Sequence, residues 1–202
     1  DRFSGQIVHA YELLVHDNED KMSFIEQFAL PIRASDLTEM FEDQSVMDVQ
    51  LPYRRLLDAT EFAGHINRER GVSLLEERYW PLVLTYDDRL YPSLALQTVM
   101  LFAEIESVEI DDAGQLILVG SDQDYEIPID SEGNLLINFV SLEELKRGTM
   151  KELSNVLANF HQGGLSFKDK IVLIGDAKDS QEQVLGPDGN PYPLLAIYGT
   201  LV

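Results

Sequence analysis

The fold of this chain is decided by residues 91–130, which read YPSLALQTVM LFAEIESVEI DDAGQLILVG SDQDYEIPID. Apolar residues dominate 94–106, and this predicts a largely buried helix that begins after the N-cap residue Ser93. Three short apolar segments then alternate with breaks rich in Asp and Gly, a pattern typical of β-strands joined by tight turns. Residues 107–129 are therefore predicted to form an antiparallel meander directly after the helix.

The flanking segments predict further strands over residues 6–15, 80–84 and 135–140. They also predict a helix that begins at Pro52 and ends at Gly64. A last helical pattern covers 142–160, and because it contains Gly148 it is either one helix or two. The apolar run at 171–176 is typical of a central strand buried on both faces. Helices mixed with hairpin and buried strands predict an α/β fold, with a mixed β-sheet, flanking helices and an antiparallel meander. We expect residues 1–202 to form a single domain.

Composition restricts the classes of partner. The chain has 36 acidic against 15 basic residues and a net charge of -21, so its mean field repels nucleic acid and anionic lipid headgroups. A cationic ligand or a basic partner surface remains open, and solubility is the alternative explanation of the charge. Because cysteine is absent, the sequence excludes disulfides, thiolate catalysis and cysteine-ligated metals. The start at Asp1 and the apolar end at Leu201-Val202 lead us to expect a segment excised from a longer protein.

Known catalytic motifs are missing from the sequence. It contains no glycine-rich nucleotide loop, no H-E-x-x-H and no G-x-S-x-G, so we expect no enzyme, cofactor or metal site. The histidines are scattered, and we interpret His9, His16, His65 and His161 as core-edge or surface residues. Ser93 is interpreted as a helix N-cap rather than as a nucleophile.

One acidic segment partly matches a calcium-binding loop. Asp130, Glu132 and Asn134 alternate as the first ligands of such a loop do. However, Leu135 occupies the position of the required glycine, and Ser141 that of the final glutamate. We therefore interpret this segment as a hairpin turn.

Two further acidic turns, Asp111-Asp112 and Asp122-x-Asp124, have the composition to share a divalent ion, although solvated loops explain them as well. They are also the only support for a third hypothesis, an acid–base hydrolase that uses paired carboxylates.

Four short segments follow one another in an order that resembles a known family. They are Gly64-His65-Ile66-Asn67 with the later Gly71-Val72 and Pro81-Leu82, Tyr91-Pro92-Ser93-Leu94-Ala95-Leu96, residues 127–139 with Ile127-Pro128-Ile129-Asp130 and Leu135-Leu136-Ile137-Asn138-Phe139, and Phe167-Lys168-Asp169-Lys170-Ile171-Val172-Leu173-Ile174-Gly175-Asp176-Ala177. Together they are similar to the middle section, apolar helix, hairpin and closing strand of type-2 CHASE domains, over roughly residues 52–176. The chain departs from that pattern at 194–199, where a His-Ala-Asn-like stretch is expected, and the family's opening strand and following helix are not evident before Asp1.

This resemblance implies an extracytoplasmic (periplasmic or cell-surface) sensor domain, held by membrane helices and joined to a cytoplasmic output such as a nucleotide cyclase, a diguanylate cyclase or a protein kinase. We therefore expect the signal-input domain of a bacterial transmembrane receptor, which binds an unidentified small ligand or protein partner. The alternative is a ligand-independent module that sets receptor geometry or forms a homodimer, and the apolar stretches 94–102 and 194–202 motivate it.

The weak candidates for ligand binding are polar residues beside predicted buried elements: Asn67, Ser93, Asn138 and Asp176. Asp176 stands at the carboxyl end of the predicted central strand, where open α/β sheets often bind ligands. The alternative for all four is a structural cap or a turn hydrogen bond.

Overall fold

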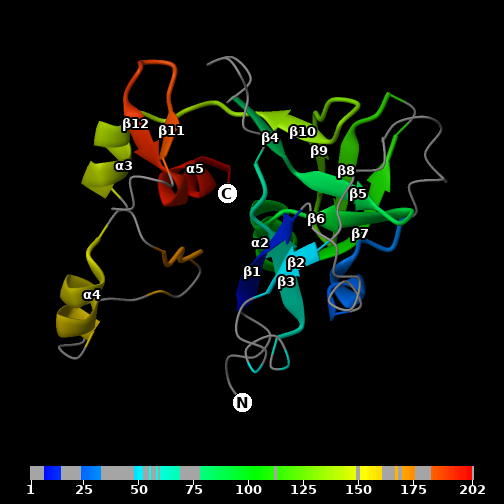
Figure 1. The fold of residues 1–202 in the computed structure, drawn as a ribbon, viewed down its shortest axis with the longest axis horizontal. Coiled ribbons are helices and arrows are strands. Elements are labelled where there is room, and N and C mark those ends of the chain that lie inside the picture. Colours follow the sequence, from blue (N-terminus) through cyan, green and yellow to red (C-terminus); the bar gives the residue numbers. More distant parts are fainter. Residues whose placement is uncertain are drawn as a thin grey trace. The chain divides into compact units, whose positions relative to one another are not determined.

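The computed structural model describes residues 7–14, 24–32, 48–51, 55, 58, 60–68, 78–111, 113–148, 151–160, 167, 170–175 and 183–201. The chain divides into two compact units, which are described separately below. Unit 1 comprises residues 1–70 and 79–136, and unit 2 comprises residues 71–78 and 137–202. Helices and strands are mixed throughout (Figure 1), and the predicted α/β class is confirmed.

A three-stranded mixed sheet lies in unit 1 (Figure 1), with the strand order β2-β1-β3. It contains β1 (Val8–Leu14), β2 (Asp48–Gln50) and β3 (Phe62–His65). The predicted strand over 6–15 is thus confirmed by β1. β1 pairs antiparallel with β2 and parallel with β3, in a register that places Tyr11 opposite His65.

Gly64 lies within β3, so the prediction that it ends a helix is wrong. A Cβ atom on Gly64 would lie 2.5 Å from the backbone nitrogen of Leu94 and 2.6 Å from its Cα. A glycine inside a strand often marks such a close approach of another backbone segment, and the same residue type also ends helices. The predicted helix start at Pro52 lies outside the described residues.

Helix α2 (Leu94–Phe102) leads directly into the meander. It ends before the predicted Glu106, because Glu104 adopts a left-handed φ of 52° and β7 begins at Ile105. The strands β7 (Ile105–Ile110), β8 (Leu116–Gly120) and β9 (Asp124–Ile127) pair antiparallel in the order β7-β8-β9 (Figure 1), which confirms the predicted meander.

Four short strands complete the sheets of unit 1. They are β4 (Tyr79–Pro81), β5 (Val83–Tyr86), β6 (Arg89–Pro92) and β10 (Asn134–Leu136). The predicted strand over 80–84 is therefore two strands separated at Leu82, and the predicted strand over 135–140 ends at Leu136. β5 and β6 form a hairpin whose turn residues Asp87 and Asp88 both have positive φ, as a type I′ turn requires.

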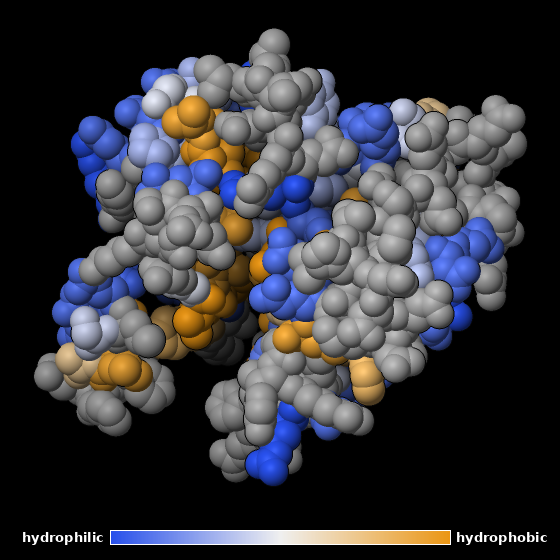
Figure 2. Space-filling view, viewed as in Figure 1, coloured by the Kyte–Doolittle hydropathy of each residue, from blue (hydrophilic) through white to orange (hydrophobic). Residues whose placement is uncertain are grey.

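Unit 1 contains two clusters of buried apolar residues. One includes Tyr11, Leu13, Ala63 and Tyr91, packed with Ile25 and Phe28 around the 3-10 helix η3 (Glu26–Phe28). The other joins α2 to the meander, through the residues Leu30, Leu82, Val83, Leu90, Leu96, Val108, Leu116 and Leu118. Among the residues that Figure 2 colours by hydropathy, both hydrophilic and apolar residues reach the surface.

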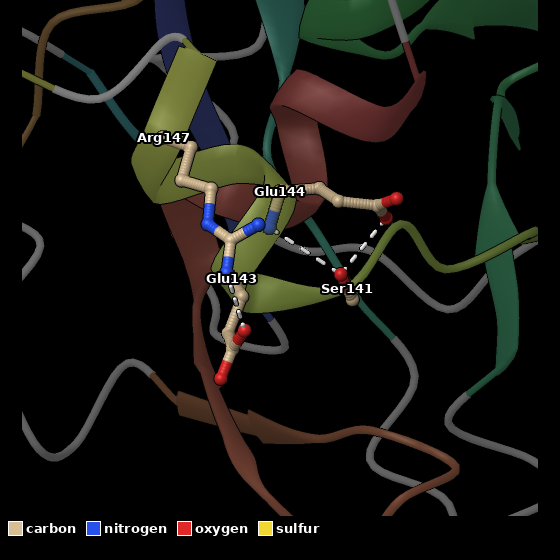
Figure 3. Close-up of polar contacts among 4 residues, drawn as sticks. All are labelled: Ser141, Glu143, Glu144 and Arg147. Atoms are coloured by element: carbon tan, nitrogen blue, oxygen red, sulfur yellow. Dashed lines mark hydrogen bonds and ion pairs between the residues drawn. The ribbon is translucent and has the colours of Figure 1, made fainter.

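In unit 2 the predicted helix over 142–160 is two helices, α3 (Leu142–Gly148) and α4 (Leu153–Phe160). Ser141 caps the start of α3 (Figure 3): the Glu144 backbone N–H donates to Ser141 Oγ at 3.3 Å, and Ser141 Oγ donates to Glu144 Oε2 at 2.8 Å. One turn further on, Arg147 forms an exposed ion pair with Glu143 at 3.2 Å.

The polar stretch near the C-terminus contains a hairpin that we did not predict. Strands β11 (Gln183–Leu185) and β12 (Pro191–Pro193) pair antiparallel and lead into α5 (Leu194–Leu201). In the loop, the Asp188 carboxylate accepts hydrogen bonds from the Asn190 side chain at 2.8 Å and the Asn190 backbone at 3.0 Å. These bonds lower the pKa of Asp188.

The predicted central strand at 171–176 is wrong for the part that the structure describes. Residues 171–175 have irregular backbone, and the exposed fractions are 48% for Val172 and 79% for Ile174. An apolar run indicates a tendency to form a strand, but a buried parallel strand also needs partners from distant parts of the chain. The sequence of this segment does not contain that information.

Candidate functional site

The candidate site is the place in unit 1 where β1, β3 and the start of α2 meet, and we call it the β1–β3–α2 junction. It comprises Tyr11, Gly64, His65, Asn67 and Ser93. His65 is the central residue, because its backbone pairs with Tyr11 in β1 and forms a parallel bridge with Ser93. Two of the four predicted binding residues, Asn67 and Ser93, therefore lie on either side of His65.

The Asn67 side chain extends the pairing of β1 and β3 beyond the end of the strands. Its Oδ1 accepts from the Leu13 backbone N–H at 2.8 Å, and its Nδ2 donates to the Leu13 carbonyl at 2.7 Å. Between the strand and this side chain, the Ile66 N–H donates to the Tyr11 carbonyl at 2.8 Å. The carboxamide thus acts as a short piece of backbone.

Thr60 forms hydrogen bonds at the other end of the β1–β3 pair, where both strands begin. This buried hydroxyl lies 2.9 Å from the Ile7 carbonyl and 3.0 Å from the Phe62 carbonyl. We did not predict this role, because Thr60 was placed on a helix. Its position directly before the apolar-to-glycine segment 62–64 was the available signal.

Ser93 connects the sheet to α2. It is fully buried, and its Oγ accepts from the Leu96 backbone N–H at 3.2 Å, so the predicted N-cap is confirmed. Its own N–H donates to the Leu82 carbonyl at 2.7 Å. The Gly64 backbone approaches this same turn closely, because an added Cβ would lie 2.5 Å from the Leu94 nitrogen.

His65 is fully buried, and neither ring nitrogen has a hydrogen-bond partner in the described part of the chain. Burial lowers the pKa of His65 to about 3, so the imidazole is neutral in the folded protein at neutral pH. The prediction of a core-edge or surface position is thus wrong for His65, whereas the partly buried His9 agrees with it. His16 and His161 lie outside the described residues.

Tyr11 adds a second polar group to the interior of the junction. Its hydroxyl has no hydrogen-bond partner among the described residues, and burial, with a further contribution from Tyr91, raises the pKa of Tyr11. Burial also raises the pKa of Tyr91 to about 12. Of the residues whose burial is described, the buried polar ones include no aspartate or glutamate. The buried polar groups that the structure describes at the junction are therefore the neutral side chains of Tyr11, His65 and Ser93.

The other two candidates lie elsewhere. Asn138 is exposed in unit 2, shortly after β10, and Asp176 lies outside the described residues. The structure thus brings Asn67 and Ser93 together around β3, and it describes Asn138 in a separate unit. Ligand binding by these four residues stays a prediction.

The acidic segment at 130–134 is a turn, as predicted, but the flanking strands β9 and β10 pair with β8 and β4 and not with each other, so the predicted hairpin is wrong. Asp130 Oδ1 accepts from the backbone N–H groups of Glu132 at 3.0 Å and Asn134 at 2.8 Å. In the meander, Asp111 Oδ1 binds the backbone of Gln115 in the same way at 2.8 Å. Among the described residues, no group of three or more histidine, aspartate or glutamate side chains is placed to hold a metal ion.

Comparison with protein families identifies the chain. The model of the CHASE2 domain matches residues 14–202, which includes the resemblance seen over 52–176 and extends through the divergent segment 194–199. The comparison with curated proteins and the comparison with solved structures each gave no match. Within the described ranges, no helix combines the length and apolar character needed to cross a membrane. With a match over nearly its whole length, the chain belongs to the CHASE2 family, a family of extracellular sensory domains.

Proposed function

We propose that this CHASE2 domain is the signal-input part of a bacterial transmembrane signalling protein, and that it binds a small ligand or a protein partner outside the cytoplasm. The observation that carries this proposal is the family match over residues 14–202. The described part of unit 1 adds two of the candidate residues, Asn67 and Ser93, which lie at the β1–β3–α2 junction.

A ligand shifts the equilibrium between two conformations of a sensor only if it binds one of them more tightly than the other. The junction gives unit 1 a route for such a change, because Gly64 and Ser93 connect β3 directly to the first turn of α2. A ligand that moves β3 would move α2 as well. In this proposal Asn67 and Ser93 respond to a ligand bound by unit 1. In unit 2, the exposed side chain of Asn138 is a separate candidate for direct contact with a ligand.

Net charge guides the choice of ligands to test. A charge of -21 attracts cations and basic groups, so calcium, magnesium and an oligolysine peptide belong in the panel with amino acids, organic acids and sugars. Thermal unfolding of the chain is then measured with each compound. A ligand at 100 times its dissociation constant adds about 2.7 kcal/mol, which raises Tm by about 5 to 10 °C for a domain of this size.

A compound that raises Tm by this amount supports direct sensing. The exposed Asn138 then allows a matched test, because Asn138→Ala should reduce the shift while leaving the Tm without ligand unchanged. The panel counts against the proposal if no compound shifts Tm, and the ligand-independent dimerising module then becomes the better explanation.

The dimerising alternative can be examined on the structure. The two apolar stretches that motivated it are covered only in part: Leu96 in α2 is 2% exposed and Ile197 in α5 is 0% exposed, whereas Phe102 in α2 is 55% exposed. Among the described residues, Phe102 and Leu157, at 52% exposed, are apolar side chains that a dimer could bury. Sedimentation of the chain at high concentration decides between a monomer and a homodimer.

A further inference from the structure

His65 occupies a position that permits only one charge state. Its backbone is fixed on both sides, by Tyr11 in β1 and by Ser93 before α2. Its side chain is 0% exposed, and neither ring nitrogen is hydrogen-bonded within the described ranges. A protonated imidazole would need a partner for each of its two N–H groups, and none of the described residues supplies one.

The elements on either side of His65 offer no negative charge. In β1, Tyr11 lies opposite His65 and His9 lies on the same face, whereas strand alternation places Glu12 on the opposite face. Helix α2 contains no ionisable side chain. From this side, His65 faces a neutral phenol and a second histidine.

Among the described elements, β6 and η3 also pack against β3. β6 contributes Tyr91 and Arg89, and η3 contributes Glu26. Glu26 is paired with Arg89 at 3.6 Å, and their side chains are 48% and 37% exposed. The one carboxylate of these two elements is thus partly solvated and already has a cationic partner.

We propose that His65 makes unit 1 acid-sensitive, because protonation of its imidazole forces the β1–β3–α2 junction to open and admit water. A buried cation without a counter-charge or hydrogen bonds is strongly unfavourable, so the proton binds to the open form. Opening separates β3 from the first turn of α2, the same connection through which a signal would pass. The inference concerns the opening equilibrium of unit 1 and does not depend on the proposed ligand.

The direction of the effect follows from linkage. The pKa of His65 is about 3 in the folded chain, against an ordinary value of 6.5. The open form therefore binds the proton more tightly, and stability is complete above about pH 6.5 and lost as the pH falls toward 3. Between pH 7 and pH 5, His65 alone should lower the ratio of closed to open molecules about 25-fold.

The experiment compares urea unfolding at pH 7 and pH 5 for the wild-type chain, His65→Leu and the control His9→Gln. Trp80 is the only tryptophan of the chain and is buried in unit 1, so its fluorescence reports this unit. Each variant differs from wild type by one titrating group, so the difference in pH dependence isolates one histidine. Between pH 7 and pH 5, the ratio of folded to unfolded molecules should fall about 25-fold more in wild type than in His65→Leu. His9→Gln should show the same pH dependence as wild type. Equal pH dependence in wild type and His65→Leu would overturn the proposal.

A second measurement covers the case in which His65→Leu does not fold. NMR of the wild-type imidazole should show His65 neutral in the folded protein down to pH 5, with the charged form present only in unfolded molecules. A folded-state His65 resonance that titrates near pH 6.5 contradicts the proposal. Neither outcome bears on ligand binding, which the thermal panel tests separately.

Discussion

The β1–β3–α2 junction of unit 1 and residues 171–175 of unit 2 each combine apolar residues with a glycine, yet the structure treats them differently. In the junction, a Cβ on Gly64 would meet the Leu94 backbone at 2.5 Å, whereas a Cβ on Gly175 would meet the flexible Leu195 side chain at 3.2 Å. Ala63 beside Gly64 is fully buried, and Ile174 beside Gly175 is 79% exposed. Apolar composition therefore does not distinguish a packed strand from an exposed segment. The two segments differ instead in what surrounds their glycines.

Gly64→Ala should produce the largest change in stability. The added methyl group meets backbone atoms that cannot rotate away, so we expect a loss of about 3 kcal/mol or more. Urea unfolding followed by Trp80 fluorescence measures it. Gly175→Ala, whose methyl group meets only a mobile side chain, should cost much less, and similar losses at the two positions would remove the distinction between the regions.

Asn67→Ala tests the side-chain extension of the β1–β3 pair. The substitution leaves the N–H and carbonyl of Leu13 without their partner, at a cost of about 2 kcal/mol. The matched control is Asn138→Ala in unit 2, which removes the same carboxamide from an exposed position and should change stability by less than about 0.5 kcal/mol. Equal effects in the two variants would contradict the role of Asn67.

Tyr11→Phe should have a smaller effect, of the opposite sign. The substitution removes a buried hydroxyl that has no partner among the described residues, so we expect stability to stay constant or to rise by about 1 kcal/mol. Tyr125→Phe, at a side chain that is 38% exposed, serves as the control and should change nothing. A loss above about 1 kcal/mol in Tyr11→Phe would mean that the hydroxyl is hydrogen-bonded after all.

Ile174→Ser should have the smallest effect, below about 0.5 kcal/mol, because the side chain is already 79% exposed. Leu118→Ala in the meander provides the contrast: Leu118 is 0% exposed, and its truncation should cost about 2 to 5 kcal/mol. A loss of that size in Ile174→Ser would mean that Ile174 is buried, as the sequence predicted, and would contradict the structure of this segment.

The elements that could be predicted from the sequence are those whose signals are local. The meander is joined by short Asp- and Gly-containing turns, and Ser93 caps a helix three residues away, so neighbouring residues contain all the information. The β1–β3 pair is different, because Asn67 binds Leu13 across 54 residues of sequence. Pairing over such a separation leaves no local pattern.

The candidate site was predicted in part for the same reason. Asn67 and Ser93 were recognised as polar residues beside buried elements, whereas the burial of His65 and the contact at Gly64 arise from strands that meet only in the fold. The β5–β6 hairpin was also missed, because its Asp87-Asp88 turn has positive φ at both residues without a glycine.

Native-state hydrogen exchange at pH 7 tests the difference between the two regions most directly. We expect strong protection for the amides of Leu13, Ile66 and Ser93, which donate to Asn67, Tyr11 and Leu82 and should exchange only when unit 1 opens. The amides of residues 172–174 should exchange at rates near those of an unstructured peptide. Protection at 172–174 equal to that of the junction, or rapid exchange at Ile66, would contradict the account.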